Sequence, residues 1–221
     1  LAVIKSHGGS GSKYRGERMR GLKAKECEIY SPPRVTAAAR RFPRLGILPG
    51  TALDLTTHDD TGLPWDFSIP AQRKKAEALL DKEKPILLIG SPSCTPFSNI
   101  QNLNKGRRDP GVIEDELTRG RVHLAWCCRL YLRQVERGAY FLHEHPASAF
   151  SWRVPSMIRI FEGIDCGTVT VSYCSFGAPI RKNTTIGYVF ATRMERFRGR
   201  TCQGGHSHEV LVGSKTTQAS E

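Results

Sequence analysis

The run of apolar residues at 85–90 (PILLIG) restricts the fold of this chain more than any other feature. A short continuous apolar run is typical of a strand that is buried on both faces, as in a parallel sheet covered by helices. Amphipathic helical patterns lie on either side of it, at 70–84 and at 114–138, and the first begins with Pro70, a residue that favours a helix start. We therefore predict a central strand with a helix before it and a helix after it.

Further short strands are predicted in the rest of the chain, separated by turns. These strands lie at 27–30, 51–55, 140–143, 168–173 and 185–191. Turns are predicted at Pro49-Gly50 and at His145-Pro146. Because strands alternate with helices, the pattern favours an α/β fold with a mostly parallel sheet flanked by helices.

The charge balance favours a polyanionic partner. The chain has 33 Lys and Arg residues against 21 Asp and Glu, a formal net charge of +12. A surplus of this size points to nucleic acid, although part of it lies in the basic segment 1–25, which alone would be a solvated electrostatic arm. No apolar run reaches the length of a membrane span, so we expect no membrane partner.

Cysteine usage indicates a reducing compartment. Seven cysteines, an odd number without the dense spacing of a secreted scaffold, favour an intracellular protein, nuclear if the source is eukaryotic. The chain opens with Leu1 and a Gly/Ser-rich basic stretch, so we expect it to be part of a longer polypeptide. We predict a basic flexible tail at 1–25, a core at 26–200 and a C-terminal tail at 201–221.

The segment Gly90–Ser98 (GSPSCTPFS) directly follows the predicted central strand. In open parallel sheets, ligands bind beyond the carboxyl ends of the strands. This segment resembles the cysteine loop of the cytosine-5 DNA methyltransferase family, Gly-x-Pro-Pro-Cys-x-Pro-Phe-Ser, with Ser93 in place of the second proline. The resemblance implies a Rossmann-like methyltransferase fold, S-adenosylmethionine as cofactor and Cys94 as the nucleophile.

The chemistry explains why a cysteine is needed in such a loop. Carbon 5 of cytosine is not nucleophilic until a thiolate adds at carbon 6, which requires an exposed cysteine on a rigid turn. The prolines on either side of Cys94 favour that rigidity. A single cysteine near a strand end is often only a small buried apolar residue, and this alternative stays open.

Residues 140–146 (YFLHEHP) resemble the Glu-Asn-Val motif of the same family. The resemblance implies that Glu144 holds the amino group and ring nitrogen of a flipped cytosine. A metal site at His143, Glu144 and His145 is the alternative chemistry, but strand alternation turns Glu144 away from both histidines. A purely structural role for the three residues also remains open.

Residues 176–184 resemble the family stretch aromatic-Gly-x-Pro-Gln-x-Arg-x-Arg, whose arginines contact the base and a phosphate. The nearest equivalents are Arg181 and Lys182, and we assign the assisting catalytic role to Arg181. Ile180 replaces the glutamine and Thr184 replaces one arginine. An exposed basic turn without a catalytic role is therefore the competing interpretation.

The resemblance also implies a cofactor site. Asp54, after the second strand, would bind the ribose, and Asp66 and Phe67 would contact the adenine. Tyr30, Ser31 and Pro92 would also line this site. The family has a glycine-rich turn after the first strand, whereas this chain has YSPPR at 30–34, and prolines cannot donate backbone hydrogen bonds.

Three features bear on the choice of function. The motifs occur in the family's order, and SPPRV with LDLTT also resembles open reading frames associated with retroelements in microbial eukaryotes. The family's target-recognition domain is missing from the segment after Ala191. Cys202, His206 and His208 are metal-ligand types, but zinc usually takes four ligands and the remaining donors, such as Cys174 or Cys166, are remote in sequence, so no metal is assigned.

We accordingly expect transfer of a methyl group to carbon 5 of cytosine in nucleic acid, DNA rather than RNA. The first alternative is a binding module, a methyltransferase fold that has lost catalysis and keeps its affinity for nucleic acid. The second is an amino-group methyltransferase, whose activity would not need Cys94.

Overall fold

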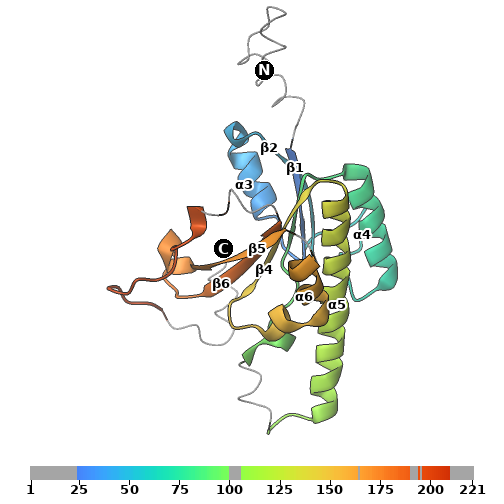
Figure 1. The fold of residues 1–221 in the computed structure, drawn as a ribbon. Coiled ribbons are helices and arrows are strands. Elements are labelled where there is room, and N and C mark those ends of the chain that lie inside the picture. The colour runs from blue at the N-terminus through green and yellow to red at the C-terminus, as the bar shows by residue number, and fades with distance from the viewer. Residues whose placement is uncertain (1–23, 100–105, 164, 190–193, 195, 210–221) are drawn as a thin grey trace, which may run out of the picture. The chain divides into compact units, whose positions relative to one another are not determined.

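The computed structural model describes residues 24–99, 106–163, 165–189, 194 and 196–209, and Figure 1 shows the fold. The chain divides into two compact units, residues 1–88 and 89–221. The predicted basic tail lies outside the described residues, except for Ala24 and Lys25, which already belong to the first strand. Among the described helices, none combines the length and the apolar character needed to cross a membrane.

The described part of the first unit, residues 24–88, contains two parallel strands and two helices besides the start of a third strand. Its elements are β1 (Ala24–Ile29), α3 (Val35–Arg41), the 3-10 turn η1 (Pro43–Leu45), β2 (Ile47–Leu53) and α4 (Pro70–Glu83). Strand order is β2-β1-β3, where β3 spans Leu87–Gly90, and Ala24 lies opposite Ile47 and Ile29 opposite Leu53. α4 confirms the predicted helix at 70–84: Pro70 is in its first turn, and Ala76 and Leu80 are buried.

The predicted turn at Pro49-Gly50 is wrong, because both residues lie inside β2. Among the described strands, β2 pairs only with β1 and lies at the edge of the sheet, so the missing N–H of Pro49 can face away from the ladder. Close packing explains why residue 50 is a glycine. A Cβ at this position would overlap the carbonyl oxygen of Glu26 and crowd the sulfur of Cys27.

We expect Gly50→Ala to lower the free energy of unfolding by about 1–3 kcal/mol, because β1 and β2 would have to move apart to admit one methyl group. Urea denaturation followed by circular dichroism measures this. Gly106→Ala is the matched control, since a Cβ there has open space around it. An equal effect of the two substitutions would contradict the close contact between β1 and β2.

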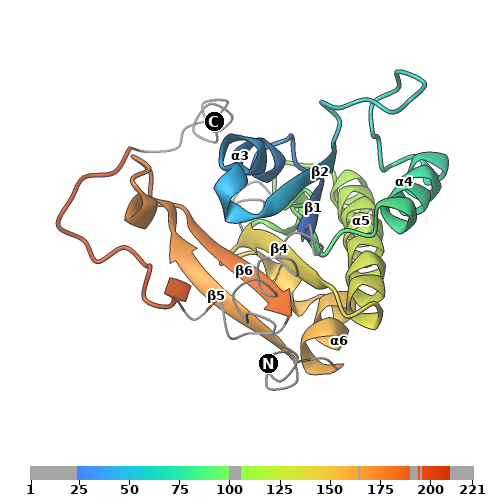
Figure 2. The same cartoon turned by 90° about the horizontal axis from the view of Figure 1, so that it is seen from above.

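The second unit begins within β3 (Leu87–Gly90), which crosses the boundary between the units. Its other strands are β4 (Tyr140–Pro146), β5 (Cys166–Ser172) and β6 (Asn183–Val189). The order is β3-β4-β6-β5, and β6 is antiparallel to both β4 and β5. Figure 2 shows β4, β6 and β5 side by side. Short 3-10 turns are η2 (Thr95–Phe97), η4 (Phe150–Arg153) and η5 (Tyr173–Phe176).

The described residues of this unit also form the helices α5 (Pro110–Glu136) and α6 (Pro155–Gly163), and α5 packs against β4, η2 and α6. α5 starts four residues before the predicted 114, because the side chain of Asp109 accepts hydrogen bonds from the first backbone amides of the helix. The predicted apolar stripe is buried at Leu124, Cys128 and Tyr131.

The predicted turn at His145-Pro146 is also wrong. β4 continues through these two residues because they pair with Thr185 and Thr184 of β6. The predicted α/β class, with strands and helices alternating along the chain, is confirmed.

Candidate functional site

The loop that carries Cys94 is held by packing at its far end. It leaves β3 at Gly90 and ends in η2, where Phe97 is 1% exposed and its ring centroid lies 5.2 Å from that of Phe150. The amide of Phe97 donates to the carbonyl of Cys94 at 2.9 Å. Cys94 itself is half-buried, so its thiol is not packed fully into the interior. The packing of Phe97 makes the turn that carries this thiol rigid.

His145 ties this loop to β4. Its Nε2 lies 2.8 Å from the carbonyl oxygen of Pro92, and its Nδ1 lies 2.7 Å from the hydroxyl of Ser151. A carbonyl only accepts, so Nε2 carries the proton and the Ser151 hydroxyl donates to Nδ1. Burial lowers the pKa of His145 to about 4, which keeps the ring neutral. Both ring nitrogens are used, so His145 cannot serve the alternative metal site.

Glu144 lies on the opposite face of β4 from His143 and His145, as strand alternation predicts. It pairs with Ile186, so Thr184 is its diagonal neighbour on the same face of the sheet. Glu144 Oε1 and Thr184 Oγ1 are both buried without a hydrogen-bond partner among the described residues. A buried polar atom left unpaired costs about 1–3 kcal/mol, so the two atoms are suited to a polar ligand.

The charges of Glu144 and Lys182 both act on the thiol of Cys94. Burial raises the pKa of the Cys94 thiol above its ordinary value; the ammonium of Lys182 opposes this rise and the carboxylate of Glu144 adds to it. The three residues come from the three separate motifs and all lie in the second unit. A half-buried thiol influenced by both a carboxylate and an ammonium is suited to a cysteine-dependent attack on a polar base.

The basic residue that acts on Cys94 is Lys182, and this differs from the assignment of Arg181. Arg181 is exposed, and its charge acts on the thiols of Cys174 and Cys202. Lys182 is half-buried, with its Nζ 5.0 Å from the ring centroid of Tyr173.

We expect the pH profile of Cys94 alkylation to report this arrangement. Glu144→Gln should move the profile to lower pH, because it removes a charge that raises the pKa, and Lys182→Met should move it to higher pH. The rate of iodoacetamide labelling at Cys94, followed by peptide mass spectrometry between about pH 7 and 11, measures it. Arg181→Met is the control; a shift equal to that of Lys182→Met would contradict the placement of Lys182.

The first unit contains all the residues predicted to bind the cofactor except Pro92. Glu28, which the sequence did not single out, organises their first loop. Glu28 is 1% exposed, and its Oε1 accepts from the amides of Arg34 and Thr36 at 3.1 and 2.8 Å. Its Oε2 accepts from the hydroxyl of Ser31 at 2.9 Å. Tyr30 takes a left-handed conformation, with φ of 57°. The carboxylate thus fixes the loop where the family has glycines.

The other predicted cofactor residues lie in two turns. Asp54 Oδ1 accepts from the amide and hydroxyl of Thr56, and Asp66 Oδ1 does the same with Ser68. Phe67 is 3% exposed, and its ring meets that of Tyr30 edge-on at 4.8 Å.

A buried donor lies in the second of these turns. Trp65 Nε1 has no hydrogen-bond partner among the described residues. Two acids, an aromatic pair and an unpaired indole donor suit a ligand with hydroxyls, an amine and a flat ring, as S-adenosylmethionine has. Pro92 belongs to the second unit, and its carbonyl is already bonded to His145.

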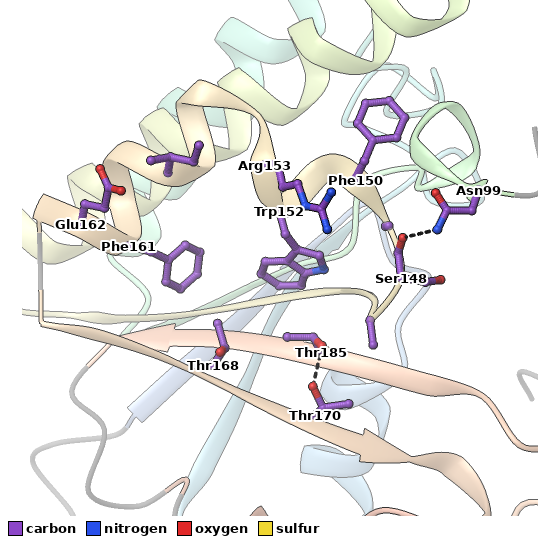
Figure 3. A pocket seen from close by; sticks show the side chains of 13 residues that line it. Asn99, Ser148, Phe150, Trp152, Arg153, Phe161, Glu162, Thr168, Thr170 and Thr185 are labelled. Atoms are coloured by element: carbon purple, nitrogen blue, oxygen red, sulfur yellow. Dashed lines mark hydrogen bonds between the residues drawn. The ribbon is translucent and has the colours of Figure 1, made fainter. Parts of the chain in front are cut away.

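A cavity of about 580 Å³ lies in the second unit and contains none of the predicted site residues (Figure 3). Trp152 and Phe161 line it together with Thr168, Thr170 and Thr185. Thr185 pairs with His145 and Thr170 with Thr185, so the cavity lies on the face of the sheet opposite to Glu144.

No protein-family model matches the chain, and no curated protein matches it significantly. The chain is similar to a solved structure from E. coli described as a DNA modification methyltransferase encoded within a prophage: 16% identity, TM-score 0.45, covering 74% of this chain and 45% of that one. It is also similar to a methyltransferase of Entamoeba histolytica: 14% identity, TM-score 0.42, covering 86% and 58%. The chain spans about half the length of these proteins. At this similarity, a functional assignment rests on the chain's own residues.

Proposed function

We propose that this chain transfers a methyl group to carbon 5 of cytosine in DNA, through a covalent adduct with Cys94. One observation carries the proposal: the charges of Glu144 and Lys182, from two distant segments of the same unit, both act on the half-buried thiol of Cys94. The unpaired Glu144 Oε1 and Thr184 Oγ1 supply hydrogen-bonding atoms for the polar edge of a base. The net charge of +12 suits a polyanionic substrate.

The proposed reaction assigns a step to each residue. The Cys94 thiolate adds to carbon 6 of a cytosine that has left its stack, while Glu144 holds the amino group and ring nitrogen. Electron density then reaches carbon 5, which would take the methyl group as the methyl–sulfur bond of the donor breaks and its electron pair returns to the sulfur. Loss of the carbon 5 proton to solvent or a base expels the thiolate and restores the ring. Lys182 favours the thiolate form that both the addition and the departure need.

The methyl donor fits the residues of the first unit. S-adenosylmethionine, when bound, supplies an electrophilic methyl group on a sulfonium. Asp54 would hold the ribose hydroxyls, and Asp66 the exocyclic amine. Phe67 and Tyr30 would face the adenine, with Trp65 Nε1 as a further donor.

Nucleoside analysis tests the proposed product. The chain is incubated with isotope-labelled S-adenosylmethionine and cytosine-containing DNA, the DNA is digested, and the nucleosides are separated by mass spectrometry. The proposal predicts label in 5-methylcytosine. Label in N4-methylcytosine or N6-methyladenine would replace it with amino-group methylation, and label in RNA but not in DNA would correct the substrate.

A binding module without catalysis is the second candidate, and the loop after β1 favours it. Pro32 and Pro33 lack amide hydrogens, and Glu28 already binds the amides of Arg34 and Thr36, so this loop offers a ligand few backbone donors. Calorimetry with S-adenosylmethionine separates the two candidates. Heat of binding supports the enzyme, whereas DNA binding without any cofactor heat supports the module.

A further inference from the structure

Four metal-ligand side chains, none of which belongs to the proposed catalytic residues, meet at one place in the second unit. Cys174 belongs to η5, and Cys202, His206 and His208 come from the segment that the sequence assigned to a C-terminal tail. The ligand atoms of the four residues all lie within 4.8 Å of one another. The sequence left the fourth ligand open, and the fold supplies it.

The distances within this cluster match a tetrahedral ion. Zinc–sulfur and zinc–nitrogen bonds imply a sulfur-to-nitrogen separation of roughly 3.5 Å across a tetrahedron. Cys202 Sγ lies 3.4 Å from His208 Nε2 and 3.9 Å from His206 Nε2. Two thiols with two imidazoles are a ligand set that zinc prefers, and four protein ligands are typical of a structural site. We propose that Cys174, Cys202, His206 and His208 bind a structural zinc ion.

Neighbouring backbone groups orient these ligands. His206 Nδ1 lies 3.0 Å from the carbonyl of Gly204, which fixes Nδ1–H as the donor and leaves Nε2 for a metal. The amide of Gly204 approaches Cys202 Sγ at 3.5 Å. Gly204 and Gly205 have φ of 80° and 77°, which only glycine adopts readily, and they turn the chain so that the two histidines return to Cys202.

Hydrogen bonds place the segment independently of the cluster. Ser172 N donates to Arg200 O at 2.9 Å, and Cys202 N donates to Ser172 Oγ at 2.9 Å. Further along, Glu209 N donates to Pro179 O at 2.9 Å, and Ile180 forms a bridge with Glu209. A zinc ion would therefore fasten residues 199–209 to η5.

The location suggests what the ion stabilises. The turn between η5 and β6 carries Lys182, and its residues Pro179 and Ile180 are paired with Glu209 directly after the cluster. An ion at the cluster would thus hold the turn that presents Lys182 to Cys94; this consequence, unlike the zinc site itself, rests on the proposed function.

Metal analysis of the 221-residue chain tests the site. The chain is expressed with zinc, purified in the presence of a reductant, and measured by inductively coupled plasma mass spectrometry. We expect about one zinc ion per chain, and a cobalt-substituted sample with the visible absorption bands of a tetrahedral site. Cys202→Ser and His208→Gln should each lose the metal. Cys166→Ser is the matched control, a half-buried cysteine outside the cluster, and should keep it.

A second measurement does not depend on the variants folding. Removing zinc from the wild-type chain with a chelator should lower its melting temperature, and adding zinc chloride should restore it. A chain that holds no zinc and shows no tetrahedral cobalt spectrum would overturn the proposal. So would a Cys174–Cys202 disulfide found in place of the metal. Both readouts are independent of methylation, so failure of the catalytic proposal leaves this test intact.

Discussion

Replacing Cys94 with serine is expected to lower the rate of cytosine methylation by at least about a thousandfold, the scale seen when a covalent nucleophile is removed. Serine has nearly the same size, but its hydroxyl stays protonated at neutral pH and is a much weaker nucleophile than a thiolate. Steady-state transfer of labelled methyl groups to DNA measures the effect.

The fold should tolerate this substitution, since a change from sulfur to oxygen at a half-buried loop position costs within about 1 kcal/mol. Cys166→Ser, at another half-buried cysteine, is the matched control and should retain activity. If Cys94→Ser kept most of the wild-type rate, the thiolate mechanism would be wrong and amino-group methylation would become the better account.

His145→Ala is expected to have the largest effect on stability, a loss of about 3–5 kcal/mol in the free energy of unfolding. The ring is 1% exposed, and its removal leaves a cavity and takes away the partners of the Pro92 carbonyl and the buried Ser151 hydroxyl. Equilibrium urea denaturation measures it. The exposed His58 supplies the control substitution, His58→Ala, with little expected effect. A loss below about 1 kcal/mol would mean that His145 does not anchor the cysteine loop.

The protonation of His145 adds a pH signature. Its pKa in the folded chain is about 4, below its ordinary value of 6.5, so as pH falls the unfolded chain takes up the proton first. Stability should fall as pH drops from 6.5 to about 4, by roughly 3 kcal/mol for this residue. The pKa of His143 is also lowered by burial, so it adds to the decline. In His145→Ala the decline should be shallower.

Local patterns predicted the kinds of element well, and their ends less well. In α4 and α5 the apolar residues recur at helical spacing over several turns. This pattern predicts a helix because every turn buries the same face. Turn signals failed at Pro49-Gly50 and at His145-Pro146. In the first case the proline sits on an edge strand, and in the second the pairing partner, β6, lies far along the chain. Neither fact is visible in a short window of sequence.

The candidate site also has parts that the sequence could predict and parts that it could not. Cys94 and Glu144 were predictable because a loop at a strand end and the alternation of β4 are local properties. The choice between Arg181 and Lys182 could not be made in this way, because both residues precede β6 and strand alternation does not extend to them.

The contacts that hold the site together could not be predicted from local sequence patterns. His145 reaches Pro92 across 53 positions, and Cys202 reaches Ser172 across 30. Such pairs depend on how distant strands come together, which one sequence without relatives does not specify.

Trapping with an oligonucleotide that contains 5-fluorocytosine is the most direct test of a thiolate adduct at Cys94. Fluorine at carbon 5 cannot leave as a cation, so the enzyme stays bound after methyl transfer. With S-adenosylmethionine present, the account predicts a covalent protein–DNA complex that survives denaturing electrophoresis, maps to Cys94 by mass spectrometry and is absent in Cys94→Ser. A chain that binds the oligonucleotide and S-adenosylmethionine yet forms no such complex would contradict it.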